Sequence, residues 1–219
     1  RHGPGETLES LADEPMRVAR AAKQLGLKFV VITSVTRDDL PDEGADHFAR
    51  VIRALRETCG SRLLIETLVP DFHAREDCLR IVLAARPDVF NHNIETIARL
   101  YPTVRPQADY ARSLRALETA KHLDSTLLIK SGLMVGLGET QDEARACISD
   151  LRRAGCDILT VGQYLQPSKT HLPVHEFVHP DVFKSYESYA MDLSFRAAAC
   201  GVFVRSSYQA EQMLRGKNQ

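Results

Sequence analysis

The 219-residue sequence predicts an α/β protein built on a parallel sheet. Short apolar runs rich in β-branched residues alternate with helical segments of about 10 to 15 residues, which is the pattern of repeated βαβ units. No linker or low-complexity tract interrupts this alternation, so we expect a single domain over residues 1–219. The chain opens with a helix rather than a strand, and a βα barrel should begin with a strand. We therefore expect the first strand of the fold to be missing from this chain.

The first predicted helix runs from Glu14 to Leu25, with Asp13 as a possible N-cap before Pro15, and Gly26 ends it. Residues 1–13 are expected to form a lead-in loop, residues 14–195 the βα units and residues 196–219 a C-terminal segment. The first predicted strand is the apolar, β-branched run 29–34. The remaining predicted strands cover 63–69, 88–93, 126–135, 157–163 and 196–200. The remaining predicted helices cover 45–58, 75–85, 110–122, 140–154 and 180–193.

The composition is that of an ordinary globular protein, with 44% hydrophobic and 26% charged residues. No apolar run approaches the roughly 20 residues that cross a bilayer, so no membrane association is expected. A net charge of −1 gives no reason to expect a nucleic-acid partner. No two cysteines lie within four residues of each other, so no CxxC-type metal or redox motif is present. The odd number of scattered cysteines predicts free thiols in a reducing compartment. The five cysteines are Cys59, Cys78, Cys147, Cys156 and Cys200.

The carboxyl ends of the predicted strands are unusually polar, and this is where parallel βα folds place their chemistry. Burial of a charge or an amide in a dry interior costs several kcal/mol unless the group is paired. Several strand ends in succession carry such groups, so the sequence predicts a polar ligand pocket at this edge of the sheet. The polar residues include Thr33, Ser34, Glu66, Asn91, Asn93, Glu95, Lys130 and Gln163.

Seven motifs in register over most of the chain resemble those of the lipoyl synthase family. The Arg205-Ser206-Ser207-Tyr208 motif is the most specific of them, whereas the Gly-Leu-Gly-Glu run at 136–139 is weak by itself. The run at 136–139 forms one motif together with Lys130 to Gly132. The other five motifs are Ile32 to Val35 with Arg37 to Asp42, Pro70-Asp71-Phe72, Asn91 to Thr96, Val104-Arg105-Pro106, and Gly162 to Pro167.

The resemblance implies a partial (β/α)6 TIM-like barrel of the radical S-adenosylmethionine (SAM) type. Members of this family are sulfurtransferases of lipoate biosynthesis that use SAM and two [4Fe–4S] clusters. They insert two sulfurs into an octanoyl-lysine to give lipoyl-lysine. The implied partner is the octanoylated lipoyl carrier domain of a 2-oxoacid dehydrogenase E2 subunit or of the glycine cleavage H protein. The implied location is the cytoplasm, or a mitochondrion or plastid in a eukaryote.

The resemblance also implies roles for individual residues. Ser207 is the expected ligand of the auxiliary cluster, and Arg205 would position substrate or cluster beside it. Side chains expected to contact SAM are Thr33, Ser34, Glu66, Asn91, Asn93, Glu95, Lys130 and Gln163. Glycines expected to let the backbone approach the adenine are Gly132, Gly136 and Gly138.

The sequence departs from the family in one important respect: it has neither of the two cysteine triads that hold the clusters. One serine cannot hold a four-iron cluster, so the chain by itself is expected to be inactive. Smaller departures are Glu43 and Ser194 where the family usually has glycine, and Val202 where it usually has proline.

Other interpretations remain open from the sequence. The chain could be a cluster-free paralogue that binds SAM or the octanoylated carrier without catalysis. It could also be an unrelated aldolase-like barrel, although Lys130 would then have to form a Schiff base. Asp38 and Asp39 could form a solvated turn, and Ser206 and Ser207 an ordinary polar turn. A zinc site in the H-x₃-H-x₃-H run that starts at His171 is disfavoured, because prolines interrupt it.

Overall fold

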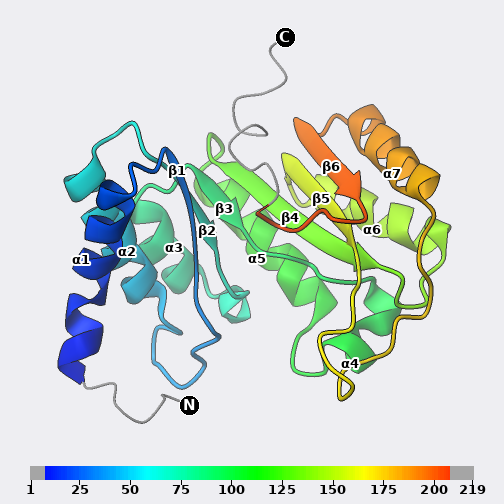
Figure 1. The fold of residues 1–219 in the computed structure, drawn as a ribbon, viewed down its shortest axis with the longest axis horizontal. Helices are drawn as coiled ribbons and strands as arrows, with labels where there is room; N and C mark the ends of the chain where they lie inside the picture. The colour runs from blue at the N-terminus through cyan, green and yellow to red at the C-terminus, as the bar shows by residue number, and fades with distance from the viewer. Residues whose placement is uncertain (1–7, 208–219) are drawn as a thin grey trace.

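The computed structural model describes residues 8–207, with side chains from Asp13 onward. One sheet of six parallel strands lies at its centre, and the strands follow one another in sequence order from β1 to β6 (Figure 1). The predicted parallel α/β fold is therefore confirmed, and the strand order fits a partial barrel. The strands are β1 (Phe29–Thr33), β2 (Leu64–Leu68), β3 (Val89–Asn91), β4 (Leu128–Val135), β5 (Ile158–Gln163) and β6 (Ala197–Gly201).

The helices connect successive strands and cover one face of the sheet (Figure 1). Neighbouring helices pack against one another, and α1 packs mainly against α2. The long helices are α1 (Leu8–Gln24), α2 (Ala45–Cys59), α3 (Glu76–Ala84), α5 (Tyr110–Leu123), α6 (Gln141–Arg153) and α7 (Pro180–Asp192). Short helical turns that the sequence pattern did not predict are η1 (Phe72–Ala74), η2 (Ala98–Leu100) and α4 (Tyr101–Val104).

The predicted start of the first helix is wrong. Helix α1 begins at Leu8, so Pro15 lies inside it and Asp13 is not its N-cap. The five residues from Leu8 to Ala12 include no glycine or proline and are mostly good helix formers. A proline inside a helix removes a backbone hydrogen bond and costs about 3 kcal/mol. The packing of the amphipathic helix against α2 outweighs that cost.

The two faces of the sheet carry separate apolar clusters. Because successive side chains of a strand point to opposite faces, Ile65, Phe90 and Ile129 join the large core beneath the helices. Val89 and Ile158 belong instead to a smaller cluster on the other face, with Leu64 and Leu128 packed against it. This small cluster fills the inner face near the amino ends of the strands and leaves the carboxyl ends to polar groups.

Both positions at which the family usually has glycine adopt a left-handed backbone conformation. Glu43 has φ 53° and Ser194 has φ 64°. Residues with a β-carbon disfavour this region, whereas glycine enters it freely. Glycine would adopt these two conformations without strain. The side chains of Glu43 and Ser194 therefore strain the backbone at both positions.

Among the helices of the described residues, none has the length and apolar character to cross a membrane.

Candidate active site

The carboxyl ends of the first three strands open into a cavity of about 730 Å³, which we call the mouth cavity. This volume lies in the range of about 300–1,000 Å³ that is usual for small-molecule sites. Four of the predicted site residues line it: Thr33, Ser34, Asn93 and Glu95. The remainder of the lining comes from the end of β2, the loops after β1 and β2, His92, residues 104–108 and Arg112.

Asn93 and Glu95 carry hydrogen-bond acceptors in the wall of this cavity. The Oδ1 atom of Asn93 is buried and has no hydrogen-bond partner among the described residues. Burial raises the pKa of the Glu95 carboxyl, although Arg105 and a hydrogen bond from Asn93 favour its ionised form. A buried acceptor without a partner costs about 1–3 kcal/mol, which a ligand donor can recover. The pair is therefore suited to a ligand that brings donors or positive charge.

Glu95 is held in a strained conformation by two backbone hydrogen bonds to β4. Its φ is 66°, in the left-handed region. Its amide donates to the Gly132 carbonyl at 3.0 Å, and its carbonyl accepts from the Met134 amide at 2.8 Å. Strained residues of this kind are typical of functional sites, where the surrounding structure fixes them.

Two arginines supply positive charge to the cavity wall. Arg112 donates from Nε to Oδ2 of Asp71 at 2.7 Å. Burial opposes ionisation of Asp71, but the hydrogen bonds from Arg112 and from the His73 amide outweigh it and lower the pKa of that carboxyl. Arg105 lies over the Tyr101 ring, with its Cζ atom 5.7 Å from the ring centroid. Since Arg112 is already paired with a carboxylate, Arg105 is the arginine better placed to meet a ligand carboxylate.

His92 forms part of the cavity wall as a neutral imidazole. Its Nδ1 lies 2.9 Å from the Val69 carbonyl, and its Nε2 lies 3.1 Å from Oγ of Ser113. Complete burial lowers its pKa to about 4, because the charged form would lose its solvation. The side chain thus bridges β2, β3 and α5 without adding charge to the site.

Three of the predicted SAM contacts form a buried network away from the cavity lining. Nζ of Lys130 lies 2.9 Å from both carboxylate oxygens of Glu66, and each side chain is 1% exposed. Asn91 donates from Nδ2 to the same carboxylate at 2.7 Å. Burial lowers the pKa of the Lys130 ammonium, and Glu66 partly offsets this effect. The network occupies the inner face of the sheet, where the residues pair with one another.

Gly132 is required for packing beside Asn93. A β-carbon at this position would lie 2.3 Å from Oγ1 of Thr160 and 3.2 Å from Oδ1 of Asn93. The first distance is far shorter than any real contact. Gly132 therefore lets β4 approach β5 while Asn93 stays at the cavity.

Gly136 and Gln163 anchor the long segment between β5 and α7. Gln163 donates from Nε2 to the Glu176 carbonyl at 2.9 Å and accepts at Oε1 from the Val178 amide at 2.9 Å. A β-carbon on Gly136 would lie 2.2 Å from Gln163 Nε2 and 2.4 Å from the Glu176 carbonyl. The space beside Gly136 is thus filled by this segment, which we call the strap (residues 164–178). Gly138 has φ 107° and faces His175 of the strap.

A second cavity of about 680 Å³ lies beneath the strap and shares Glu95, Val104 and Arg105 with the mouth cavity. Its other walls include Met134 and Leu172. The three shared residues place the two cavities side by side at the carboxyl ends of the strands. Together they form one elongated polar region with a more apolar end.

The predicted residues near the C-terminus lie beyond β6. Arg205 donates from Nη1 to the Val204 carbonyl at 2.6 Å, and Ser207 is exposed. Neither residue lines the mouth cavity or the cavity beneath the strap. Tyr208 lies outside the described residues. The roles of Arg205 and Ser207 stay predictions.

The described residues do not fit an iron–sulfur cluster. Cys78, Cys147 and Cys156 are buried, and burial raises the pKa of each thiol above its ordinary value. A cluster needs thiolates gathered at one point. Among the described residues, Asp38, Glu43 and His73 form the one group of three possible metal ligands, and it contains no cysteine.

Among the residues of the cavity wall that were not selected as site residues from the sequence are Arg105 and Arg112. Arg105 lies in the Val-Arg-Pro motif, which was a usable signal. Arg112 lies on helix α5, and from the sequence alone an arginine on a helix is expected to be a surface residue. Its contact with Asp71 depends on the tertiary fold.

A parallel sheet with its polar cavity at the carboxyl ends of the strands defines a TIM-like βα enzyme class, and comparison with known proteins specifies it. Residues 2–162 match the family profile described as "Radical SAM superfamily". In fold, the chain also resembles solved structures, among them methylornithine synthase and HydG. Methylornithine synthase matches with a TM-score of 0.64 and 17% sequence identity, and the match covers 86% of this chain and 53% of that chain. HydG, a maturase of the [FeFe]-hydrogenase, matches with a TM-score of 0.66 and 16% sequence identity, and the match covers 89% of this chain and 44% of that chain.

Curated relatives place the chain more narrowly. It is 50% identical over 208 residues to the lipoyl synthase of Caldicellulosiruptor saccharolyticus, which covers 95% of this chain and 73% of that protein. It is 54% identical over 209 residues to the lipoyl synthase of Caldicellulosiruptor bescii, covering 94% and 71%. The lipoyl synthase of Caldanaerobacter subterraneus subsp. tengcongensis is 54% identical over 199 residues, covering 91% and 69%. The chain belongs to the lipoyl synthase family of the radical SAM superfamily.

Proposed function

We propose that this chain forms the SAM- and substrate-binding part of a lipoyl synthase, which inserts two sulfurs into the octanoyl-lysine of a lipoyl carrier domain. The observation that carries the proposal is the mouth cavity. It gathers predicted site residues from β1 and β3 at one opening, in a chain that matches lipoyl synthases over nearly its whole length.

The mouth cavity has the chemistry to hold SAM. SAM brings an amino group, ribose hydroxyls and a sulfonium cation, which are donors or positive charges. Asn93 Oδ1 supplies a buried acceptor without a partner, and Glu95 supplies a carboxyl that a cation would keep ionised. Arg105 is placed to pair with the SAM carboxylate. Thr33 and Ser34 add hydroxyls to the lining of the cavity.

The clusters of the family supply the electron that cleaves SAM and the sulfurs that are inserted. The described residues include no cysteine triad, so the part played by these residues is binding, orientation and exclusion of water. The buried pair of Glu66 and Lys130 supports this role by fixing β2 to β4 beneath the cavity.

The substrate that we propose is octanoyl-lysine on the carrier domain of a 2-oxoacid dehydrogenase E2 subunit or of the glycine cleavage H protein. The cavity beneath the strap adjoins the mouth cavity at Glu95 and includes Met134 and Leu172 in its walls. An acyl chain that reaches SAM needs apolar surface next to a polar site. This adjacency favours the cavity beneath the strap as the acyl site.

The binding site is tested by titrating SAM into the chain in a calorimeter and comparing Glu95→Gln with the unaltered chain. Loss of a hydrogen bond to a charged group costs about 1.5–3 kcal/mol, so we expect affinity to fall about tenfold or more. Glu118→Gln, an exposed change on α5, is the matched control and should leave affinity unchanged. Equal affinity in Glu95→Gln and Glu118→Gln would remove Glu95 from the site.

The reaction is tested separately with the whole gene product, reconstituted under anaerobic conditions with iron and sulfide and supplied with SAM and a one-electron reductant. We expect an octanoyl-lysine peptide to become lipoyl-lysine, with 5′-deoxyadenosine formed from SAM. Assembled clusters without any deoxyadenosine would contradict the proposed function.

A further inference from the structure

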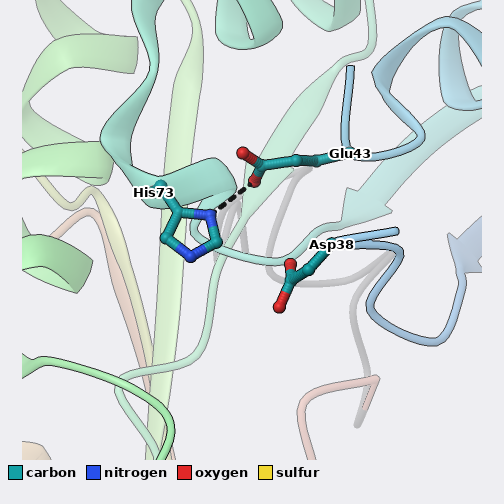
Figure 2. A group of neighbouring side chains, drawn as sticks. All are labelled: Asp38, Glu43 and His73. Atoms are coloured by element: carbon teal, nitrogen blue, oxygen red, sulfur yellow. Dashed lines mark ion pairs between the residues drawn. The ribbon is translucent and has the colours of Figure 1, made fainter. Parts of the chain in front are cut away.

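Two loops at the rim of the mouth cavity bring three potential metal ligands together. Asp38 and Glu43 belong to the loop between β1 and α2, and His73 belongs to the turn η1 after β2. One ligand atom from each residue lies within 4.8 Å of the other two. The three side chains face a common space in Figure 2. Residues 30 or more positions apart in sequence are thus gathered by the tertiary fold.

The Glu43 carboxylate is buried and incompletely paired. Its side chain is 8% exposed, and its Oε2 atom has no hydrogen-bond partner among the described residues. Nδ1 of His73 lies 3.0 Å from this oxygen as an ion-pair contact, but not in the geometry of a hydrogen bond. A buried carboxylate oxygen without a donor is costly, and a bound cation would satisfy it.

The nearest permanent positive charge is largely engaged elsewhere. Nη1 of Arg75 lies 3.5 Å from the other oxygen of Glu43, Oε1. That guanidinium also donates to the Pro41 carbonyl at 2.6 Å and pairs with Asp77 at 2.5 Å. It therefore leaves Oε2 unpaired.

Asp38 supplies the second carboxylate and is free to turn. It is exposed and makes no hydrogen bond or ion pair with any residue that the structure describes. Asp39, its neighbour, differs because Arg37 holds it through two 2.8 Å hydrogen bonds. Asp38 is thus the acid of this loop that can approach an ion beside Glu43 and His73.

We propose that Asp38, Glu43 and His73 bind a divalent first-row transition metal ion such as Zn²⁺. An imidazole with two carboxylates suits zinc and its neighbours better than calcium or magnesium, which prefer oxygen alone. The ion ties the loop after β1 to the turn after β2. Because Asp38 and His73 also line the mouth cavity, an ion held by them would lie at the rim of the ligand site.

The proposal is tested by titrating Co²⁺ into the metal-free chain and following its visible d–d absorption, with Zn²⁺ added in competition. We expect one saturable site that Zn²⁺ displaces and that shows no thiolate charge-transfer band. Asp38→Asn and His73→Gln should each weaken Co²⁺ binding by about tenfold or more. Mutation of a residue that only supports a metal ligand already lowers metal affinity by about this factor. Asp38→Asn removes no side-chain hydrogen bond or ion pair within the described residues, so we expect this variant to fold like the unaltered chain, and circular dichroism checks this.

The matched control is His47→Gln. Nε2 of His47 lies 2.8 Å from the Glu14 carboxylate, which makes a histidine–glutamate pair outside the three-residue group. This variant should bind Co²⁺ like the unaltered chain. Binding that survives both Asp38→Asn and His73→Gln, an absorption dominated by thiolate bands, or the absence of any saturable site would each overturn the proposal.

Discussion

Nζ of Lys130 lies 2.9 Å from both carboxylate oxygens of Glu66, although the two residues are 64 positions apart and each side chain is 1% exposed. The pair joins β2 to β4 across the inner face of the sheet, and Asn91 of β3 completes it. A buried ion pair contributes little net stability compared with an apolar pair, but loss of one partner leaves an uncompensated charge.

Glu66→Gln and Lys130→Met are therefore each expected to lower the free energy of unfolding by about 3–5 kcal/mol. The double variant should be less destabilised than the sum of the two, because it leaves no isolated charge. Urea unfolding followed by circular dichroism measures all three. Strictly additive losses would show that the two side chains do not act as a pair.

Stability is expected to fall as the pH drops from about 6.5 to about 4 because of His92. Its pKa is lowered from 6.5 to about 4, so in this window the unfolded chain binds a proton that the folded chain does not. Protonation of the unfolded chain therefore lowers the free energy of unfolding, by about 3 kcal/mol at the acid end of this window. Below this window, protonation of Asp71, whose pKa is also lowered, acts in the same direction.

His92→Gln should flatten the pH dependence between 6.5 and 4, whatever its effect on stability at neutral pH. Denaturant unfolding at several pH values measures the slope. The exposed His122→Gln serves as control and should retain it. An unaltered slope in His92→Gln would assign the acid sensitivity to other groups.

Gln163→Leu is expected to loosen the strap. The substitution leaves the Glu176 carbonyl and the Val178 amide without their side-chain partner, at a cost of about 2 kcal/mol or more. Hydrogen exchange should accelerate at the Val178 amide. Gln166→Leu removes an exposed hydrogen bond to the His171 carbonyl at 2.8 Å within the strap and should have little effect. Equal protection in both variants would disprove the anchoring role.

Ser194→Gly is expected to stabilise the protein by about 1 kcal/mol. Ser194 follows α7 with φ 64°, and the amides of Ser194 and Phe195 donate back to Met191 and Ala190 in the manner of a Schellman motif. Glycine enters this conformation without strain.

Ser185→Gly makes the same chemical change in the middle of α7 and should destabilise by roughly 0.5–1 kcal/mol. Thermal unfolding of the two variants compares them directly. Melting temperatures that shift in the same direction would contradict the conformational argument.

The alternation of apolar runs and amphipathic segments was enough to predict six strands and the long helices, because both periodicities are local. The first boundary was wrong, because Pro15 was read as a helix start while α1 begins at Leu8. At the polar strand ends the structure has a cavity that is lined by Thr33, Ser34, Asn93 and Glu95 among others. The sequence did not distinguish these residues from Glu66, Asn91 and Lys130, which also lie on strands but pair with one another.

By itself, the sequence determined the parallel α/β architecture, the polar edge of the sheet and, through motifs in register, the family. These properties depend on residues close together in the chain. Only the tertiary structure decided that Arg112 meets Asp71, that Gln163 holds the strap and that His73 faces Asp38 and Glu43. Such contacts depend on the packing of distant segments. Packing fixes which polar groups find partners and which are left to bind a ligand.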